Sequence, residues 1–464
     1  MRPPVLLTAL AALSAALWLG AAARRVPFPF ELTHGEDPTI IGVERVLRHQ
    51  PIYTPPTLRY IPPPYPPVTF LLGATAARLF GFTPPALRLV SVTSTLVMAA
   101  LVFMVVRRMG ARLDAACCCA AIVFAAGTRV GDALDLARVD APAALFALIG
   151  VIGAYGLADD ARRRRRWMAI AVAGFAAAML TKQPTVAIAA GAAAGLWRSD
   201  RAGDAVRMLA AAAAAAGIVF FWLDVRAGGA AWLALVSAPA RPSIPWRDVA
   251  SAVGRLFFYF PATLLVAAGW RRRGDRVWET AALAVVPMAI AANARVGGSD
   301  NVWLMYVPLL AIACGRYWTD HASRISWRHP AAWLLAAQVA VLPHRPVARV
   351  PDAADRQEHE RLVAHLSSSD ARPDDVLNLW FPYASMAAGR PPWAPRVQLF
   401  DFAPDDPLNR GLRAAIAAGA FREVIATPDD MADWMRGANP PPYVPGAGAF
   451  DLSPRVLVFV RRGM

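Results

Sequence analysis

Apolar residues occur along most of the chain in long blocks, and charged residues stand mainly between these blocks. A helix that crosses a bilayer needs about 20 predominantly apolar residues, so repeated blocks of nearly this length indicate repeated crossings. The pattern predicts a mainly α fold, a polytopic transmembrane helix bundle of about 11 spans within residues 1–343. The expected spans are 5–22, 86–106, 113–128, 140–158, 167–181, 183–197, 207–223, 253–270, 277–293, 302–318 and 331–343.

The segment 27–85 interrupts this pattern and is expected to form an external loop that carries in-plane helices. Asp37-Pro38 resembles a helix start, with Asp37 as the N-cap, and the apolar and charged residues after it alternate as in an amphipathic interfacial helix. The proline run 55–67 is expected to be extended, because proline cannot occupy a helix interior. Residues 68–80 predict a second helix, which is too short to span the bilayer comfortably.

The tail, residues 344–464, has a different pattern and predicts a small soluble α/β domain. Short apolar runs at 376–381, 397–402, 423–427 and 455–460 are typical of strands. Residues 408–419 and 428–437 predict helices, the second with Thr427 as its cap and Pro428 in the first helical position.

Charge gives the bundle an orientation. The net charge is +15, but the tail holds 14 Arg and 15 Asp or Glu, so the excess lies in short loops of the membrane part. Arginines gather in alternate loops, as the positive-inside rule predicts, which argues against a nucleic-acid-binding surface. The N-terminus is then cytoplasmic, while the 27–85 loop, Lys182, the 294–301 loop and the tail face outward. The first span also resembles a signal peptide, and under either interpretation the next segment is external.

Polar residues that could carry chemistry gather on this external side. Ionisable groups at span ends that face one compartment are candidate site residues. Tyr65, beside the proline run, could line a sugar site. The other candidates are Glu31, His34, Glu36 and Asp37 in the first loop, Asp132, Asp135, Arg138 and Asp140 in the second, Lys182, and Arg295, Asp300 and Asn301.

Each candidate also has a structural interpretation. Asp37 and Asp140 could cap helices, in which case Glu36 would be the free carboxylate and the general base, although the reverse assignment stays open. Lys182, the only lysine of the chain, and Arg295 could be interfacial cations or could bind a phosphate leaving group.

Several classes of function lack support. The chain has no P-loop, no Rossmann glycine motif, no HExxH and no GxSxG with a triad order. Its four cysteines, Cys117, Cys118, Cys119 and Cys314, lie in apolar spans and form neither a disulfide framework nor a zinc spacing. No metal ligands are assigned.

The order of the motifs resembles the GT-C membrane glycosyltransferases, namely family 39 and the RgtA/B/C/D-like and ArnT-like proteins, which are related to dolichyl-phosphate-mannose-protein mannosyltransferases. The resemblance covers roughly residues 1–340. The segments that carry it are HGEDPTIIGVERVLRHQPIY, YPPVTFLLGATAARLFG, ALRLVSV, ARVDAP, GFAAAMLTKQP and RVGGSDNVWL.

The resemblance implies a polyprenyl-phosphate sugar as donor, a lipid, glycan or protein as acceptor, and inverting transfer on the external face of the cytoplasmic membrane. It implies a first-loop base, Glu36 or Asp37, a second-loop acid, Asp140, and phosphate-binding cations, Lys182 and Arg295. Family members usually carry Asp-Glu where this chain has Glu-Asp. Some members use a divalent cation, so Mg²⁺ or Mn²⁺ is a possible cofactor.

Two other functions remain open from the sequence. A transporter or flippase of lipid-linked glycans would also be polytopic, although no internal repeat is visible and the charges sit at span ends rather than within spans. A non-enzymatic assembly partner is compatible with the inverted Glu-Asp order.

Overall fold

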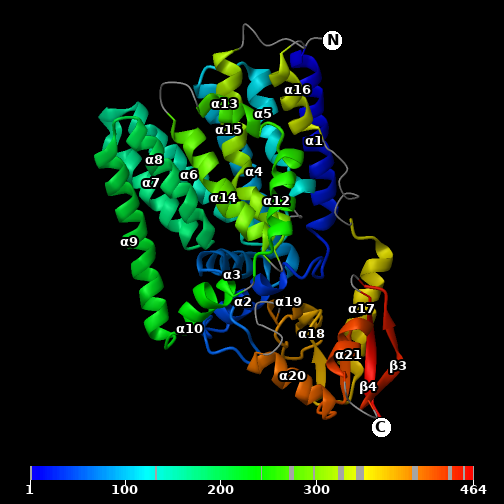
Figure 1. Ribbon diagram of the computed structural model, residues 1–464. Coiled ribbons are helices and arrows are strands. Elements are labelled where there is room, and N and C mark those ends of the chain that lie inside the picture. The colour runs from blue at the N-terminus through cyan, green and yellow to red at the C-terminus, as the bar shows by residue number, and fades with distance from the viewer. Residues whose placement is uncertain are drawn as a thin grey trace.

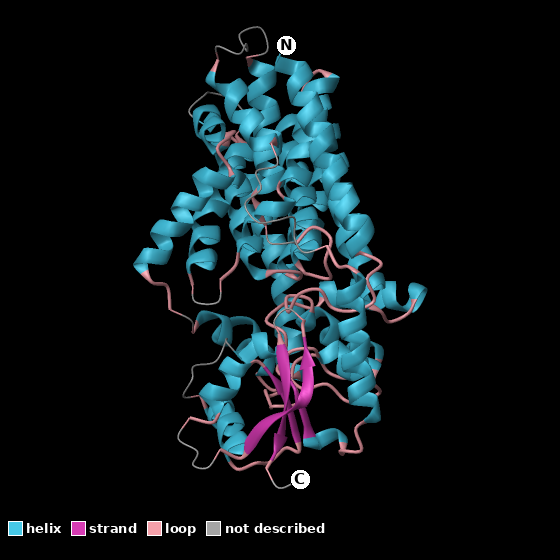
Figure 2. Cartoon of the chain, turned by 90° about the vertical axis from the view of Figure 1, so that its right-hand side faces the viewer, coloured by secondary structure: helices cyan, strands magenta, loops and turns pink. Residues whose placement is uncertain are grey.

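The computed structural model describes residues 3–130, 133–241, 243–270, 276–295, 298–321, 329–340, 350–399, 406–436, 441–452 and 455–462. It shows a long helical bundle with a smaller α/β tail at one end, and the N-terminus lies at the other end (Figures 1 and 2). Between bundle and tail lie the two short helices α2 (Asp37–Leu47) and α3 (Val68–Phe80).

The bundle has a helix at each position where the sequence predicts a span. By length and composition, five described helices can cross a membrane: α1, α4, α6, α9 and α14. The chain is therefore a polytopic membrane protein, as predicted. The bundle helices are α1 (Pro3–Arg25), α4 (Pro84–Arg108), α5 (Leu113–Ala125), α6 (Asp140–Asp159), α7 (Arg164–Met179), α8 (Val186–Arg198), α9 (Ala202–Arg226), α12 (Trp246–Tyr259), α13 (Thr263–Trp270), α14 (Val277–Ala294), α15 (Val307–Asp320) and α16 (Pro330–Val339).

Two predicted spans differ in detail. The span expected at 253–270 is divided into α12 and α13, because Pro261 follows Phe260 and proline disrupts a continuous helix. The span expected at 302–318 begins as a 3₁₀ helix, η5 (Asp300–Met305), and becomes α-helical only at Val307. Both breaks lie near the polar contacts of Asp300, which accepts hydrogen bonds from Arg255 and Tyr259 of α12.

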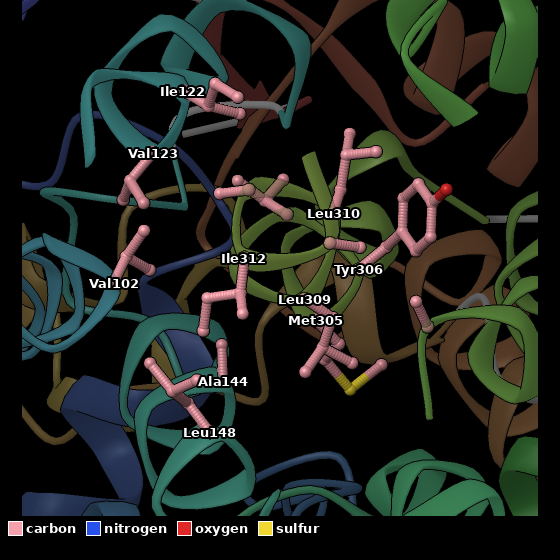
Figure 3. Close-up of a cluster of buried hydrophobic side chains, with 14 of the residues drawn as sticks. Val102, Ile122, Val123, Ala144, Leu148, Met305, Tyr306, Leu309, Leu310 and Ile312 are labelled. Carbon is pink, nitrogen blue, oxygen red and sulfur yellow. The ribbon is translucent and has the colours of Figure 1, made fainter. Parts of the chain in front are cut away.

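The core of the bundle is formed where α15 meets the earlier helices. Val307 to Gly315 are all buried. Small residues allow close helix contact elsewhere, since a methyl group at Gly150 of α6 would lie 2.6 Å from the Phe175 ring of α7. Such close packing matters in lipid, where apolar burial between helices gains little. Figure 3 shows the core side chains Val102, Ile122, Val123, Ala144, Leu148, Met305, Tyr306, Leu309, Leu310 and Ile312.

Helices α2 and α3 close the end of the bundle that faces the tail (Figure 1). They pack tightly because both lack a side chain where they meet: Gly42 of α2 lies against the Phe70 ring, and Gly73 of α3 lies against Val43. The first half of α2 is buried, so this amphipathic helix packs between bundle and tail. It thereby holds the first-loop acids inside the protein.

The tail contains a four-stranded sheet with strand order β1-β2-β4-β3, formed by β1 (Val376–Asn378), β2 (Glu423–Ala426), β3 (Tyr443–Phe450) and β4 (Val456–Arg461). Strands β1 and β2 are parallel, and the other pairs are antiparallel. Three predicted strands are confirmed, whereas the strand expected at 397–402 is wrong, since Arg396–Leu399 forms helix α19. Residues 400–405 lie outside the described residues.

The helices of the tail are α17 (Ala353–Ser368), α18 (Pro382–Ala387), α20 (Pro407–Ala417) and α21 (Pro428–Trp434). The predicted Thr427 cap is confirmed, because its side chain accepts a hydrogen bond from the Asp430 amide. The sequence prediction missed α17 and β3. The tail is attached to the first loop by the Arg59–Asp374 ion pair and by the Arg59 guanidinium, which stacks 3.3 Å from the Trp393 ring centroid.

Candidate active site

The first-loop acids lie where α2 begins, under α4. Glu36 is fully buried and accepts two hydrogen bonds from Arg88 of α4, each of 2.8 Å. It also accepts from the amides of Leu32 at 2.8 Å and Ala137 at 2.9 Å. Although burial opposes ionisation, the charge and hydrogen bonds of Arg88 lower the pKa of Glu36. The carboxylate is therefore charged and fully occupied.

Arg88 also holds the backbone between the end of α1 and the first-loop acids. It is fully buried, and its guanidinium also donates to the carbonyl oxygens of Arg25, Phe28 and Phe30 at 2.6 to 3.0 Å. The sequence analysis did not single out this residue. A charged residue within the apolar block 86–106 was the signal that could have revealed it.

Asp37 has the opposite environment. It is fully buried, and neither carboxylate oxygen makes a hydrogen bond. The imidazole of His34 faces it, with Nδ1 3.4 Å from Oδ2. Burial raises the pKa of Asp37, although the contact with His34 acts against this. The chain buries this acid without satisfying it, which is rare for buried polar groups.

The expected cap assignment is corrected by these contacts. Helix α2 begins at Asp37, so Glu36 occupies the N-cap position, and no side-chain cap bond is present. The Asp37 carboxylate therefore does not cap the helix, and the Glu36 carboxylate is engaged in hydrogen bonds. Asp140 does not cap α6 either, because it is the first helical residue and its side chain contacts other groups.

Unsatisfied polar atoms continue along the first loop. Both oxygens of Glu31 and the hydroxyls of Thr33 and Thr39 are buried without a hydrogen bond. Burial, reinforced by Asp37, raises the pKa of Glu31 to about 8. Such a concentration within nine residues indicates a functional site, since structural segments satisfy their buried polar groups.

A second cluster surrounds Asp140 at the start of α6. Lys182 Nζ lies 2.5 Å from Oδ1, Asn301 Nδ2 lies 2.9 Å from the same oxygen, and Arg138 Nε lies 3.2 Å from Oδ2. Three separate loops thus converge on one buried carboxylate. The structure brings together four of the residues that the sequence singled out.

Gly35 joins the two clusters. A methyl group at this position would lie 2.9 Å from Cζ and Nη1 of Arg138, so the guanidinium lies directly against the first-loop backbone. Glycine thus allows this close approach, which a side chain would prevent unless the guanidinium moved. The Arg138 guanidinium of the second cluster therefore lies beside the first-loop backbone, next to a residue that is two positions before Asp37 in the sequence.

The remaining candidates occupy other surroundings. Asp300 accepts hydrogen bonds from Arg255, at 3.1 Å, and from Asn293, at 3.0 Å, so it belongs to a neighbouring polar cluster. Arg295 donates through Nη1 to Pro239 O at 2.6 Å. Tyr65 packs against the apolar cluster of α2 and α3. Asp132 lies outside the described residues.

An apolar groove runs along the bundle beside the second cluster. It is open on one side and is lined almost entirely by apolar side chains. Gln183, which follows Lys182, is its polar residue, and its amide donates to Pro64 O and Leu235 O. The lining residues are Pro66, Pro67, Met179, Leu180, Gln183, Val186, Ala216, Gly217, Phe220, Leu223, Leu235 and Val236.

No candidate metal site is found among the described residues. In the part of the chain that the structure describes, no group of three His, Cys, Asp or Glu side chains could hold an ion. Asp140, the acid of the second cluster, already faces the cations Arg138 and Lys182, which would repel a metal ion.

The comparisons agree with this fold. Residues 64–225 match the family model described as dolichyl-phosphate-mannose-protein mannosyltransferase. The structure is similar to ArnT from Cupriavidus metallidurans bound to undecaprenyl phosphate, with a TM-score of 0.62, 14% identity and 98% of both chains covered. A comparison with curated protein sequences finds no match.

Two structures from Archaeoglobus fulgidus are also similar. An oligosaccharyltransferase tethered to an acceptor peptide has a TM-score of 0.52 and 13% identity, covering 97% of this chain and 74% of that chain. The oligosaccharyltransferase AglB, in complex with an inhibitory peptide and a dolichol-phosphate, has a TM-score of 0.50 and 14% identity, covering 89% and 69%. The resemblance to the GT-C membrane glycosyltransferases is thus confirmed, and the fold is theirs.

Proposed function

We propose that the protein is a glycosyltransferase that moves a sugar from a polyprenyl-phosphate-linked donor to a hydroxyl group of a lipid, glycan or protein acceptor. The observation that carries the proposal is the contrast between two adjacent acids. Glu36 is held by four hydrogen bonds, whereas Asp37 is buried without any. A buried carboxylate whose oxygens accept no hydrogen bond is suited to take up a proton.

The second cluster supports the donor part of the proposal. A lipid-linked phosphate needs cations beside an apolar surface, because its tail remains in the bilayer. Arg138 and Lys182 are largely buried, are held by one carboxylate, and adjoin the groove that begins at Gln183. Two similar structures hold undecaprenyl phosphate and dolichol-phosphate, which supports a ligand of this chemistry.

The proposed reaction is a single displacement. The acceptor oxygen forms a bond to the anomeric carbon while the bond from that carbon to the phosphate oxygen breaks. The polyprenyl phosphate leaves with the electron pair, and Arg138 and Lys182 stabilise its charge. The acceptor proton passes to the general base, in which the Asp37 carboxylate takes part. Attack from the face opposite the phosphate inverts the configuration.

The proposed location is the external face of the cytoplasmic membrane. The arginine-rich loops alternate with the loops that build the site, and the positive-inside rule assigns the arginine side to the cytoplasm. The first loop and the tail adjoin each other at the end of the bundle away from the N-terminus (Figure 1). The N-terminus would then be cytoplasmic and the tail external.

The test is sugar transfer by membranes that contain the protein, with a panel of radiolabelled polyprenyl-phosphate sugars. The wild type should transfer label from at least one donor, and Asp37→Asn should lower the rate about 10²- to 10⁴-fold, the usual contribution of a general base. Asp248→Asn is the matched control, because Asp248 pairs only weakly with exposed Arg247. No transfer from any donor, or equal rates in Asp37→Asn and the control, would contradict the proposal.

A further inference from the structure

A small cavity, with room for little more than a hydroxyl group or a water molecule, lies between the first loop and the tail. The first loop contributes Glu31 and His34 to its wall, and the tail contributes Asp355, His359 and Phe381. Glu31 is 3% exposed, and neither of its oxygens makes a hydrogen bond. A space of this size beside an unsatisfied acid is suited to a single hydroxyl group at the end of a larger ligand.

His34 lies between this cavity and Asp37. Its side chain is 22% exposed and lines the cavity, whereas the Asp37 side chain is 1% exposed and is not part of the lining. His34 Nδ1 faces Asp37 Oδ2 at 3.4 Å, and Nε2 is buried at the cavity wall and makes no hydrogen bond. A group that enters the cavity would therefore meet the imidazole before it could meet the carboxylate.

The tail holds the imidazole in this position. Trp380 packs edge-on to His34, with ring centroids 4.6 Å apart, and Phe381 lies 5.8 Å away. Trp380 is itself fixed, because its Nε1 donates to Asp430, which also pairs with Arg396. A chain of contacts thus runs from the tail to Asp37.

We propose that the acceptor hydroxyl binds in this cavity and gives its proton to His34, while Asp37 orients the imidazole and stabilises its charged form. The inference rests on the proposed function and names the atom that receives the proton. With the Nδ1 proton directed at Asp37, Nε2 is the accepting nitrogen. The acceptor oxygen bonds to the anomeric carbon, the polyprenyl phosphate departs with the electron pair, and the proton ends on Nε2. This arrangement of a base and an orienting carboxylate is known from unrelated enzymes.

Other ionisable groups face the same space and could shape the pH dependence. Glu31 comes from the first loop, and Asp355 and His359 come from α17, while Asp37 of α2 faces His34 from behind the cavity wall. Because burial raises the pKa of Glu31 to about 8, the pH profile is measured both in the wild type and in Glu31→Gln.

The experiment compares His34→Ala, Asp37→Asn and His365→Ala in full-length protein, using the donor that the wild type accepts. His365 is a matched control, since it also faces a carboxylate, Glu423, at 2.9 Å, but lies in the tail away from the cavity. His34→Ala should lower kcat about 10²- to 10⁴-fold with an unchanged KM for the donor. Added imidazole should restore part of this loss in His34→Ala and none in Asp37→Asn.

The acid limb of the rate profile should persist in Glu31→Gln and disappear in His34→Ala with imidazole absent. Should His34→Ala fail to fold, His34→Asn tests the same point, because asparagine keeps a donor towards Asp37 but cannot take a proton. If Asp37→Asn is inactive while His34→Ala or His34→Asn stays within about tenfold of wild type, the inference is wrong and the proposed function stands. If the wild type transfers no sugar, the proposed function itself is wrong.

Discussion

Glu36→Gln and Asp37→Asn should have opposite effects: the first should lower the thermal stability, whereas the second should lower the activity without lowering the stability. Glu36→Gln places an amide where four donors converge: two from Arg88 and the amides of Leu32 and Ala137. The new NH₂ group must then face another donor, and the Arg88 charge is left buried without its partner. Breaking one partner of a buried ion pair costs about 3–5 kcal/mol. We therefore expect a clear loss of thermal stability.

Asp37→Asn should leave stability unchanged or raise it. Asp37 makes no hydrogen bond that the amide would lose, and burial already raises its pKa, which means that the charged form is disfavoured. Neutralising it removes a cost of folding. Activity per folded molecule should fall about 10²- to 10⁴-fold, because an amide can neither accept the proton nor stabilise a charged imidazole.

The assay combines thermal unfolding in detergent with sugar transfer normalised to folded protein. Glu44→Gln is the control within the same helix, since Glu44, although mostly buried, faces the exposed Arg48 at 2.9 Å rather than a buried arginine. A stable Glu36→Gln that is inactive, together with an active Asp37→Asn, would refute the reasoning and make Glu36 the base.

Three further predictions concern single contacts. Gly35→Ala should push the Arg138 guanidinium away, because the new methyl group would lie 2.9 Å from it, and should raise the KM for the donor with little change in melting temperature. Glu31 has a pKa raised from 4.5 to about 8, so the folded state holds an extra proton between these values and loses up to about 1.4 kcal/mol of stability per pH unit as the pH rises. Glu31→Gln should flatten this loss in melting curves recorded across that window, and an unchanged slope would contradict it. Thr427→Ala removes the cap of α21 and should cost about 1 kcal/mol, seen as faster proteolysis of the tail but unaltered donor binding.

The bundle could be predicted from the sequence because a span is a local property. The length and composition of an apolar block decide whether it can cross the bilayer, and no distant residue is needed. The division of the 253–270 block was visible only as Pro261, and proline within a membrane helix can kink it or end it. The tail strand expected at 397–402 failed because a short apolar run does not distinguish a strand from a helix without its partners.

The site was predictable as a set of residues but not as a set of roles. The order of the motifs singled out Glu36, Asp37, Arg138, Asp140 and Lys182, and the structure brings four loops together around them. The roles of the two adjacent acids came out reversed relative to the cap argument, because that argument used only residues next to each other in the chain. Arg88 lies 52 positions from Glu36 and decides which acid is occupied.

By itself, the sequence determined the membrane character, the order of the helices, the orientation that the arginines favour and the collection of acids and cations on one side. These features follow from local composition and from the partition of side chains between water and lipid. Only the tertiary structure decided which carboxylate is satisfied, which cations share Asp140, and that the tail reaches His34. A carboxylate's state depends on the groups within a few ångströms of it, and those groups come from segments that only folding brings together.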